Sequence, residues 1–157
     1  KVTPISPTMI LFVHLMIYTI YSAVSVVLLW VFSKLFWNFG MRGSYLTFFI
    51  GWLVVLMSIF SIGILVGGIA RNSKTASVIA SVMYFPMLVF SGATVPYEIM
   101  PVQVQKVANI MPLTQGIKIL KAATLGTEIN NVLIPIIIMV LITIICVSMA
   151  IKFFRWE

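Results

Sequence analysis

Charged residues are scarce in this sequence. Of 157 residues, 8% are charged and three are acidic, with no aspartate, whereas 62% are hydrophobic. A soluble domain carries roughly 25% charged residues, so this chain cannot cover itself with a hydrated surface. We therefore predict an integral membrane protein. The net charge of +7 comes from basic residues that flank apolar runs, where they meet lipid headgroups, so membrane lipid is expected as a partner and nucleic acid is not.

The residues that usually carry chemistry are equally rare. Cys146 is the only cysteine and lies deep in the last apolar run, which excludes an internal disulfide and a cysteine-based metal site. His14 is the only histidine. It is either a functional residue of the first span or a neutral side chain hydrogen-bonded to a neighbouring helix. All three acids lie outside the apolar runs: Glu98, Glu128 and Glu157. We expect no catalytic site, no metal site and no cofactor in this chain.

Four apolar runs are long enough to cross a membrane, which takes about 20 residues. We predict an all-α, polytopic transmembrane helix bundle that forms a single domain over residues 1–157. Between the third and fourth spans lies a long segment, 94–131, that is too apolar for a solvated loop. The predicted spans cover about residues 8–33, 44–70, 75–93 and 132–151.

The segment 94–131 has the pattern of two short amphipathic helices. Prolines divide it, and Pro112 suits the first position of the second helix. In that helix Leu113, Ile117 and Leu120 share one side, which we expect to be the apolar face, and Gly126 ends it. Such a segment is typical of a re-entrant or interfacial helical hairpin.

Two features inside the spans concern helix shape and packing. Gly63 and Gly67 have the GxxxG spacing, which lets two helices in lipid approach closely. Pro86 lies inside the third span and leaves the Val82 carbonyl without its helical donor, so we expect a kink there. The connection between the second and third spans, Arg71 to Lys74, is expected to be a short polar turn.

One string resembles a nucleotide-binding motif. Gly68 to Thr75 has the spacing of a P-loop, but Ser73 replaces the second glycine. The string also follows an apolar span and not a β-strand, which the phosphate cradle requires. ATP binding by this chain is therefore not expected.

A longer motif resembles a known family. Phe90-Ser91-Gly92 is followed by a proline-rich acidic segment, by a Pro-Leu-Thr element and by a basic short helix. This order resembles the membrane subunit of type-2 ATP-binding-cassette (ABC) transporters, and Thr3 to Ser6 resembles the end of that family's first cytosolic loop. The motif residues are Pro96, Glu98, Pro101, Pro112, Leu113, Thr114 and Lys118 to Lys121.

The chain departs from the family pattern in two ways. The family usually has asparagine before the Pro-Leu-Thr element, where this chain has Met111, with Asn109 two positions earlier. Family members also have six spans, so we expect this chain to be the last four, without two N-terminal spans. The resemblance implies a multi-pass plasma-membrane protein with both ends of this chain in the cytosol. Charge alone leaves the orientation open, because the two sides would carry equal numbers of basic residues.

The resemblance also implies a mechanism. A permease dimer would export its cargo while a separate ATPase subunit binds ATP and Mg²⁺ and hydrolyses the nucleotide. The third span would line the pathway, with Tyr84, Phe85, Leu88 and Phe90 as an apolar gate. Bulky and flexible side chains there suit an amphipathic or apolar cargo, such as a drug, peptide, lipid-linked molecule or polysaccharide.

Three alternatives stay open from the residues. The gate side chains could simply pack against neighbouring helices. The chain could belong to a scaffold or assembly protein whose bundle binds partner helices without transport. A channel is disfavoured, because no span carries a charged or amide-rich stripe to line an aqueous pore.

Overall fold

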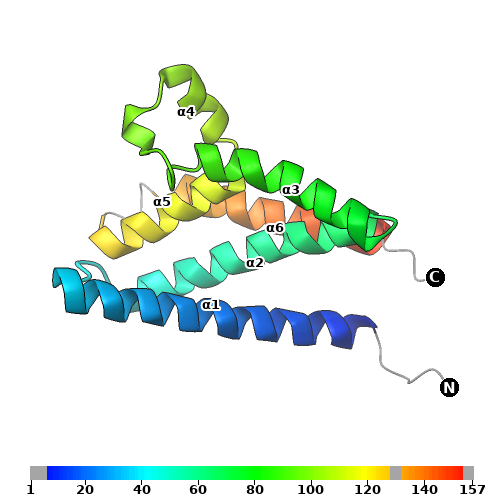
Figure 1. The fold of residues 1–157 in the computed structure, drawn as a ribbon, viewed down its shortest axis with the longest axis horizontal. Coiled ribbons are helices and arrows are strands. Elements are labelled where there is room, and N and C mark those ends of the chain that lie inside the picture. Colours follow the sequence, from blue (N-terminus) through cyan, green and yellow to red (C-terminus); the bar gives the residue numbers. More distant parts are fainter. Residues whose placement is uncertain (1–6, 128–131, 154–157) are drawn as a thin grey trace. The chain divides into compact units, whose positions relative to one another are not determined.

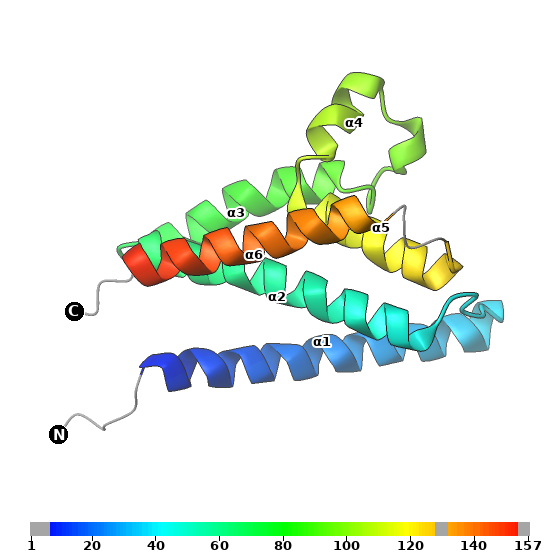
Figure 2. The same cartoon turned by 180° about the vertical axis from the view of Figure 1, so that it is seen from behind.

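The computed structural model describes residues 7–127 and 132–153, in which all regular structure is helical (Figures 1 and 2). Four of these helices are long and apolar enough to cross a membrane, which confirms the predicted all-α polytopic fold. The chain divides into two compact units, Lys1–Gly40 and Met41–Glu157. The single-domain organisation therefore stays a prediction, and each unit is described by itself.

The first unit consists of helix α1, Pro7–Trp37. Three of its polar side chains, His14, Thr19 and Ser25, bond to its own backbone one turn earlier. Thr19 donates to the Leu15 carbonyl over 2.7 Å, and Nδ1 of His14 lies 2.8 Å from the Ile10 carbonyl oxygen. His14 thus has a hydrogen-bond partner within its own helix, and its role stays open. Ser6, which precedes the helix, lies outside the described residues.

The far end of α1 carries an aromatic anchor. The Lys34 ammonium lies 5.1 Å from the centre of the Trp30 ring, a cation–π contact. Tryptophan and lysine together are typical of the membrane–water interface. The helix continues four residues past the predicted end of the span at Ser33, to Trp37, and this interface cluster explains the extension.

The second unit is built around helices α2 (Tyr45–Ile69), α5 (Pro112–Leu125) and α6 (Leu133–Phe153), which pack against one another. Their common core contains Ile119 of α5 and Met139 of α6, with Val132 just before α6 and with Val54 and Val55 of α2 against it. Ser58 of α2 is fully buried and donates to the Met139 carbonyl over 3.1 Å. An interhelical hydrogen bond of this kind is a typical link between membrane helices.

Helix α3, Ser73–Phe90, begins two residues earlier and ends three residues earlier than the predicted span. Its start is fixed by Asn72, whose Oδ1 accepts from the Thr75 amide over 2.8 Å. Ser73 and Lys74 are therefore helical and not part of the predicted turn. Its end is fixed by Ser91, whose hydroxyl donates to the Leu88 carbonyl over 2.9 Å, and by Gly92 with φ +89°.

A helical cap joins α3 to α5. It consists of the single 3₁₀ turn η1 (Tyr97–Ile99) and the short helix α4 (Val102–Ala108), which stand apart from the long helices in Figures 1 and 2. Helix α5 has 14 residues, or about 21 Å, too short to cross the roughly 30 Å hydrocarbon core. It packs on two candidate spans, α2 and α6, and the re-entrant or interfacial position expected for this segment stays a prediction. Gly126 ends it in the left-handed conformation, as predicted.

The apolar side of α5 is not its most buried side. Leu113, Ile117 and Leu120 are only half-buried, whereas the buried side of the helix contains small and polar residues. The reason is close approach: small residues bring the backbones of α5 and α2 together, which hydropathy does not register. The buried residues are Thr114, Gln115, Gly116, Ile119 and Ala123.

Candidate functional site

Helix α3 is the least covered candidate span of the second unit. None of its residues is buried by other described residues, in contrast to α2 and α6. One face carries Val78, Val82, Phe85 and Val89, at the spacing of one helix side, and these side chains are 46–68% exposed. In a membrane such a face meets lipid, a cargo pathway or a helix from outside the second unit.

The four predicted gate residues lie along the second half of α3, on both sides of Pro86. Tyr84 and Phe85 are 54% and 64% exposed, and their rings meet edge-to-face with centres 6.4 Å apart. Leu88 and Phe90 are half-buried. The gate therefore has an exposed part and a part that packs within the unit, and its role in transport stays a prediction.

Pro86 lies within a helix that continues to Phe90 without a break. Its side chain is exposed, and its ring nitrogen cannot donate to the Val82 carbonyl. The kink expected at this position stays a prediction.

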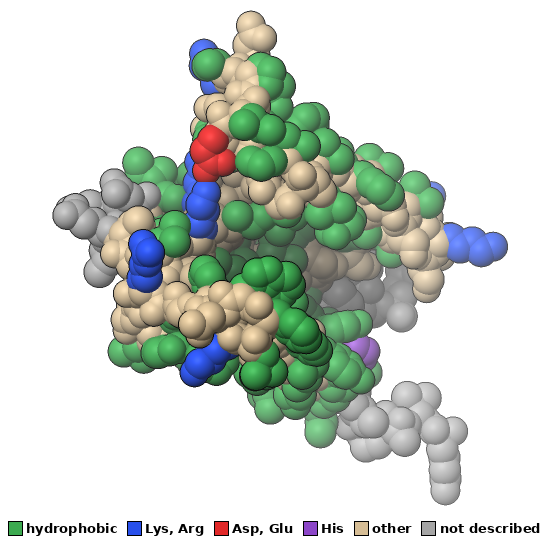
Figure 3. All heavy atoms as spheres, turned by 60° about the vertical axis from the view of Figure 1, so that its left-hand side comes forward, with side chains coloured by type: hydrophobic (Ala, Val, Ile, Leu, Met, Phe, Trp, Pro, Cys, Tyr) green, Lys and Arg blue, Asp and Glu red, His purple; other side chains and the backbone are tan. Residues whose placement is uncertain are grey.

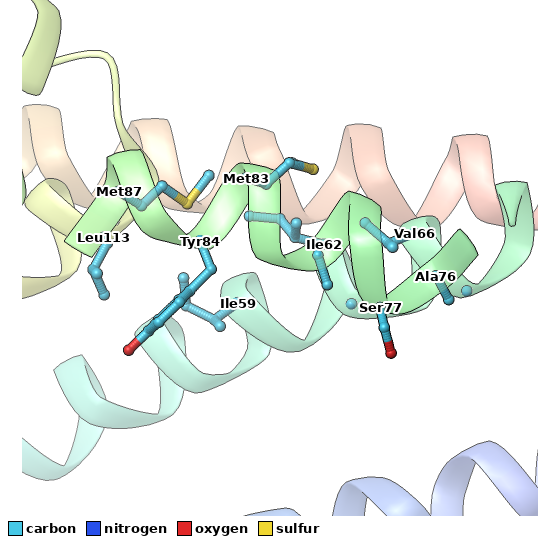
Figure 4. A pocket seen from close by; sticks show the side chains of 12 residues that line it. Ile59, Ile62, Val66, Ala76, Ser77, Met83, Tyr84, Met87 and Leu113 are labelled. Carbon is cyan, nitrogen blue, oxygen red and sulfur yellow. The ribbon is translucent and has the colours of Figure 1, made fainter. Parts of the chain in front are cut away.

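The other side of α3 faces a groove shared with α2. The groove has a volume of about 420 Å³, and its walls include Ile62 and Val66 of α2 and Met83, Tyr84 and Met87 of α3 (Figure 4). Tyr84 and Leu113 lie towards one end, and Ala76 and Ser77 lie towards the other. The lining is mainly apolar.

Gly63 and Gly67 line this groove and do not contact a second helix closely. No atom of a described residue outside their own helical turns lies within 4 Å of a Cβ built at either position. The close helix packing predicted for this pair is thus not made by the described chain. Because neither glycine has a side chain, the groove extends to the α2 backbone at these two positions.

The close helix approach occurs at glycines that the sequence did not single out. A Cβ at Gly51 would lie 2.9 Å from Cγ2 of Ile119, and one at Gly116 would lie 2.9 Å from Cγ1 of Val55. Both contacts join α2 to α5. Neither glycine belongs to a GxxxG pair. Each is a single glycine that accommodates a side chain of the facing helix. Only the amphipathic pattern of α5 hinted that a partner lay opposite.

Asn109 organises the connection between α4 and α5. Its carbonyl oxygen accepts a hydrogen bond from Nε2 of the buried Gln115, and its Oδ1 accepts one from the Lys118 ammonium. Lys118 also lies over the Tyr97 ring, 4.6 Å from its centre, and its partial burial lowers the pKa of the ammonium group. Asn109 lies two positions before the usual place of the asparagine in the family motif. It nevertheless contacts the first turns of α5, through the side chains of Gln115 and Lys118.

Glu98 fixes the other side of the cap. Its Oε1 lies 2.6 Å from Nζ of Lys121 on α5, and Figure 3 shows this acidic side chain directly against a basic one. The hydrogen bond from Lys121, more than the charge of Lys121, lowers the pKa of Glu98. Both groups are more than half exposed, so the pair contributes little stability on its own. Together with Lys118, it positions the cap on α5.

A carboxylate titration tests this contact. Because the folded-state pKa of Glu98 is lowered, the pairing is complete at neutral pH and is lost as the pH falls through that lowered value. We expect the ¹³C signal of the Glu98 carboxylate to titrate below the ordinary range of a glutamate. Lys121→Met should raise the midpoint towards that range, and Lys106→Met, on α4, should not move it. Equal midpoints in all three proteins would contradict the contact.

The four candidate spans define the class of protein: a multi-pass membrane protein, in which a short capped helix precedes the last span. The chain matches the family described as ABC-2 family transporter protein over residues 1–152. It therefore belongs to the ABC-2 transporter family.

Two curated proteins are similar to part of the chain. Over 81 residues it is 32% identical to the inner membrane transport permease YhhJ of Escherichia coli (strain K12), and to the protein of that name from Shigella flexneri. Each alignment covers 52% of this chain and 22% of the permease, so the chain spans about a fifth of the length of the curated relatives it matches. No solved structure matches the chain.

Proposed function

We propose that this chain is part of the membrane-spanning permease of an ABC exporter in the plasma membrane. A separate ATPase subunit binds ATP and Mg²⁺ and supplies the energy, and this chain catalyses no reaction. The cargo is amphipathic or apolar: a drug, a peptide, a lipid-linked molecule or a polysaccharide. Both ends of the chain face the cytosol, and the cap faces outwards.

The uncovered face of α3 is the observation that supports this proposal. A scaffold bundle would need a partner helix along this face, whereas a permease dimer would enclose an apolar pathway between two copies of it. The adjacent Tyr84, Met83 and Met87 add bulky or flexible side chains, and methionine adapts to cargoes of varied shape. The match to transport permeases supports the same choice.

Association with an ATPase tests the proposal. The full-length protein, purified from its native membrane in mild detergent, should carry an ATP-binding-cassette subunit in fixed stoichiometry. The purified complex, reconstituted in vesicles, should hydrolyse ATP and move cargo in an ATP-dependent way. Purification with membrane partners but without any such ATPase would favour the scaffold function.

Phe85→Ala is the cleanest test of the gate. Phe85 is 64% exposed, so its removal should change the unfolding free energy by only about 0.5 kcal/mol. If the ring faces the pathway, we expect a several-fold change in cargo preference or in leak, measured in vesicles beside a melting curve. Phe90→Ala and Leu88→Ala should add a loss of stability, since both side chains are half-buried.

Ile134→Ala, at an exposed position of α6, serves as the control for Phe85→Ala. Unchanged leak and unchanged preference among several cargoes in Phe85→Ala would remove Phe85 from the gate.

Disulfide cross-linking tests the dimer. The chain has one native cysteine, Cys146, so Cys146→Ala gives a background for single cysteines. Val82 is 68% exposed on the uncovered face of α3, and Val82→Cys should give a cross-linked dimer on mild oxidation in native membranes. Ile137→Cys on α6 is the control and should remain largely monomeric. Equal cross-linking at both positions would indicate random collision and not a defined interface.

A further inference from the structure

The groove between α2 and α3 is elongated. It extends along α3 from Ala76 to Met87, which corresponds to about 16 Å of helix. Its volume is about 420 Å³, and apolar side chains together with Gly63 and Gly67 form most of its lining. An apolar groove of this length suits an extended hydrocarbon chain.

Two basic residues lie next to one end of this groove. Gly67 and Ser77 line the groove, and the connection between them carries Arg71 and Lys74, both exposed. Glu98 is the one acidic side chain in the described ranges, and it pairs with Lys121. No carboxylate of the described residues is thus available to Arg71 or Lys74. Among the described residues, nothing offsets these two charges at the connection between two candidate spans.

We propose that this site binds an anionic phospholipid, with one acyl chain in the groove and the phosphate headgroup on Arg71 and Lys74. Apolar walls and a basic end match the two parts of such a lipid, and basic sites between membrane helices are known to take anionic headgroups. The lipid would lie against Tyr84 and Met87, beside the exposed face of α3. This proposal does not depend on the transport function.

Lipid binding to the purified full-length protein, measured by native mass spectrometry, tests the site. Phosphatidylglycerol and phosphatidylcholine with the same acyl chains are the probes. Each basic residue near a headgroup should raise affinity about five-fold, so Arg71→Gln with Lys74→Gln should lower phosphatidylglycerol binding about thirty-fold. Binding of phosphatidylcholine should hardly change. Lys106→Gln, which removes an equal charge from the cap, should leave both lipids unaffected.

Groove-filling variants test the acyl chain separately. Gly67→Ile and Ala80→Leu place side chains into the groove and should reduce binding of both lipids several-fold. Ile137→Phe, at an exposed position of α6, is the size control. Melting curves identify any variant that has unfolded, and the two groove positions provide independent tests.

Three results would overturn the proposal. The first is unchanged phosphatidylglycerol binding in both the charge-neutralised and the groove-filled proteins. The second is equal binding of the two lipids by the wild-type protein. The third is efficient cross-linking of Gly67→Cys to a second copy, in the Cys146→Ala background, because that would place a helix over the groove.

Discussion

Gly116→Ile is expected to prevent stable folding of the second unit. Gly116 lies on the buried side of α5, where even a Cβ would come within 2.9 Å of Cγ1 of Val55 and 3.6 Å of Cε of Met139. Isoleucine adds three further carbon atoms in that direction. Overpacking typically costs about 1–3 kcal/mol and sometimes more, and we expect a loss at or above the top of that range. Thermal unfolding in detergent measures it.

Gly67→Ile is the matched control for this prediction. The substitution is the same, but Gly67 borders the open groove, where a Cβ meets no described atom within 4 Å outside its own helical turn. The control protein should melt close to the wild type, while Gly116→Ile should melt far lower or fail to be recovered. Equal stability of the two variants would contradict the close contact of α2 with α5.

Met139→Ala is expected to have the next largest effect. Met139 is fully buried at the centre of the α2, α5 and α6 core, and its truncation leaves a cavity. Loss of a buried methionine costs about 2–5 kcal/mol. Because lipid is as apolar as the protein interior, lost packing carries most of this cost, and we expect a value in the lower half of that range. Reversible unfolding in detergent measures the change.

Ile137→Ala is the control for Met139→Ala. It distinguishes the loss of core packing from any general effect of truncating a side chain on α6. Ile137 lies two residues from Met139 and is 55% exposed, so detergent or lipid replaces most of its contacts. Its truncation should cost well under half as much as Met139→Ala. Equal losses would show that the core is not centred on Met139.

The spans were predictable from the sequence because a membrane imposes a strict length and polarity on each of them. The observed helix ends differ from the predicted ends where a hydrogen bond between a side chain and the backbone determines the end. Asn72 caps α3 two residues early, and Ser91 ends it by bonding to the Leu88 carbonyl. Pro112 and Gly126 bound α5 as predicted, since proline and glycine act through backbone geometry alone.

The packing inside the second unit could not be predicted in the same way. Gly63 and Gly67 match a known spacing, yet Gly51 and Gly116 make the close contacts, because the partner surface decides which glycine is used. Similarly, Thr114 and Gln115 are buried although their polarity suggested an exposed side. Their burial depends on polar partners that hydropathy does not register: the Phe90 carbonyl, 3.4 Å from Oγ1 of Thr114, and the Asn109 carbonyl for Gln115.

The uncovered state of α3 has a consequence for how such a protein can diverge. A buried helix is constrained at most positions, because nearly every substitution there disturbs folding. Val78, Val82, Phe85 and Val89 carry no such constraint from the described chain, so they can change while the α2, α5 and α6 core stays intact. If α3 lines the pathway as proposed, single substitutions there would give new cargo preferences without loss of folding. A mutational scan should find this helix the most permissive of the second unit's candidate spans for folding.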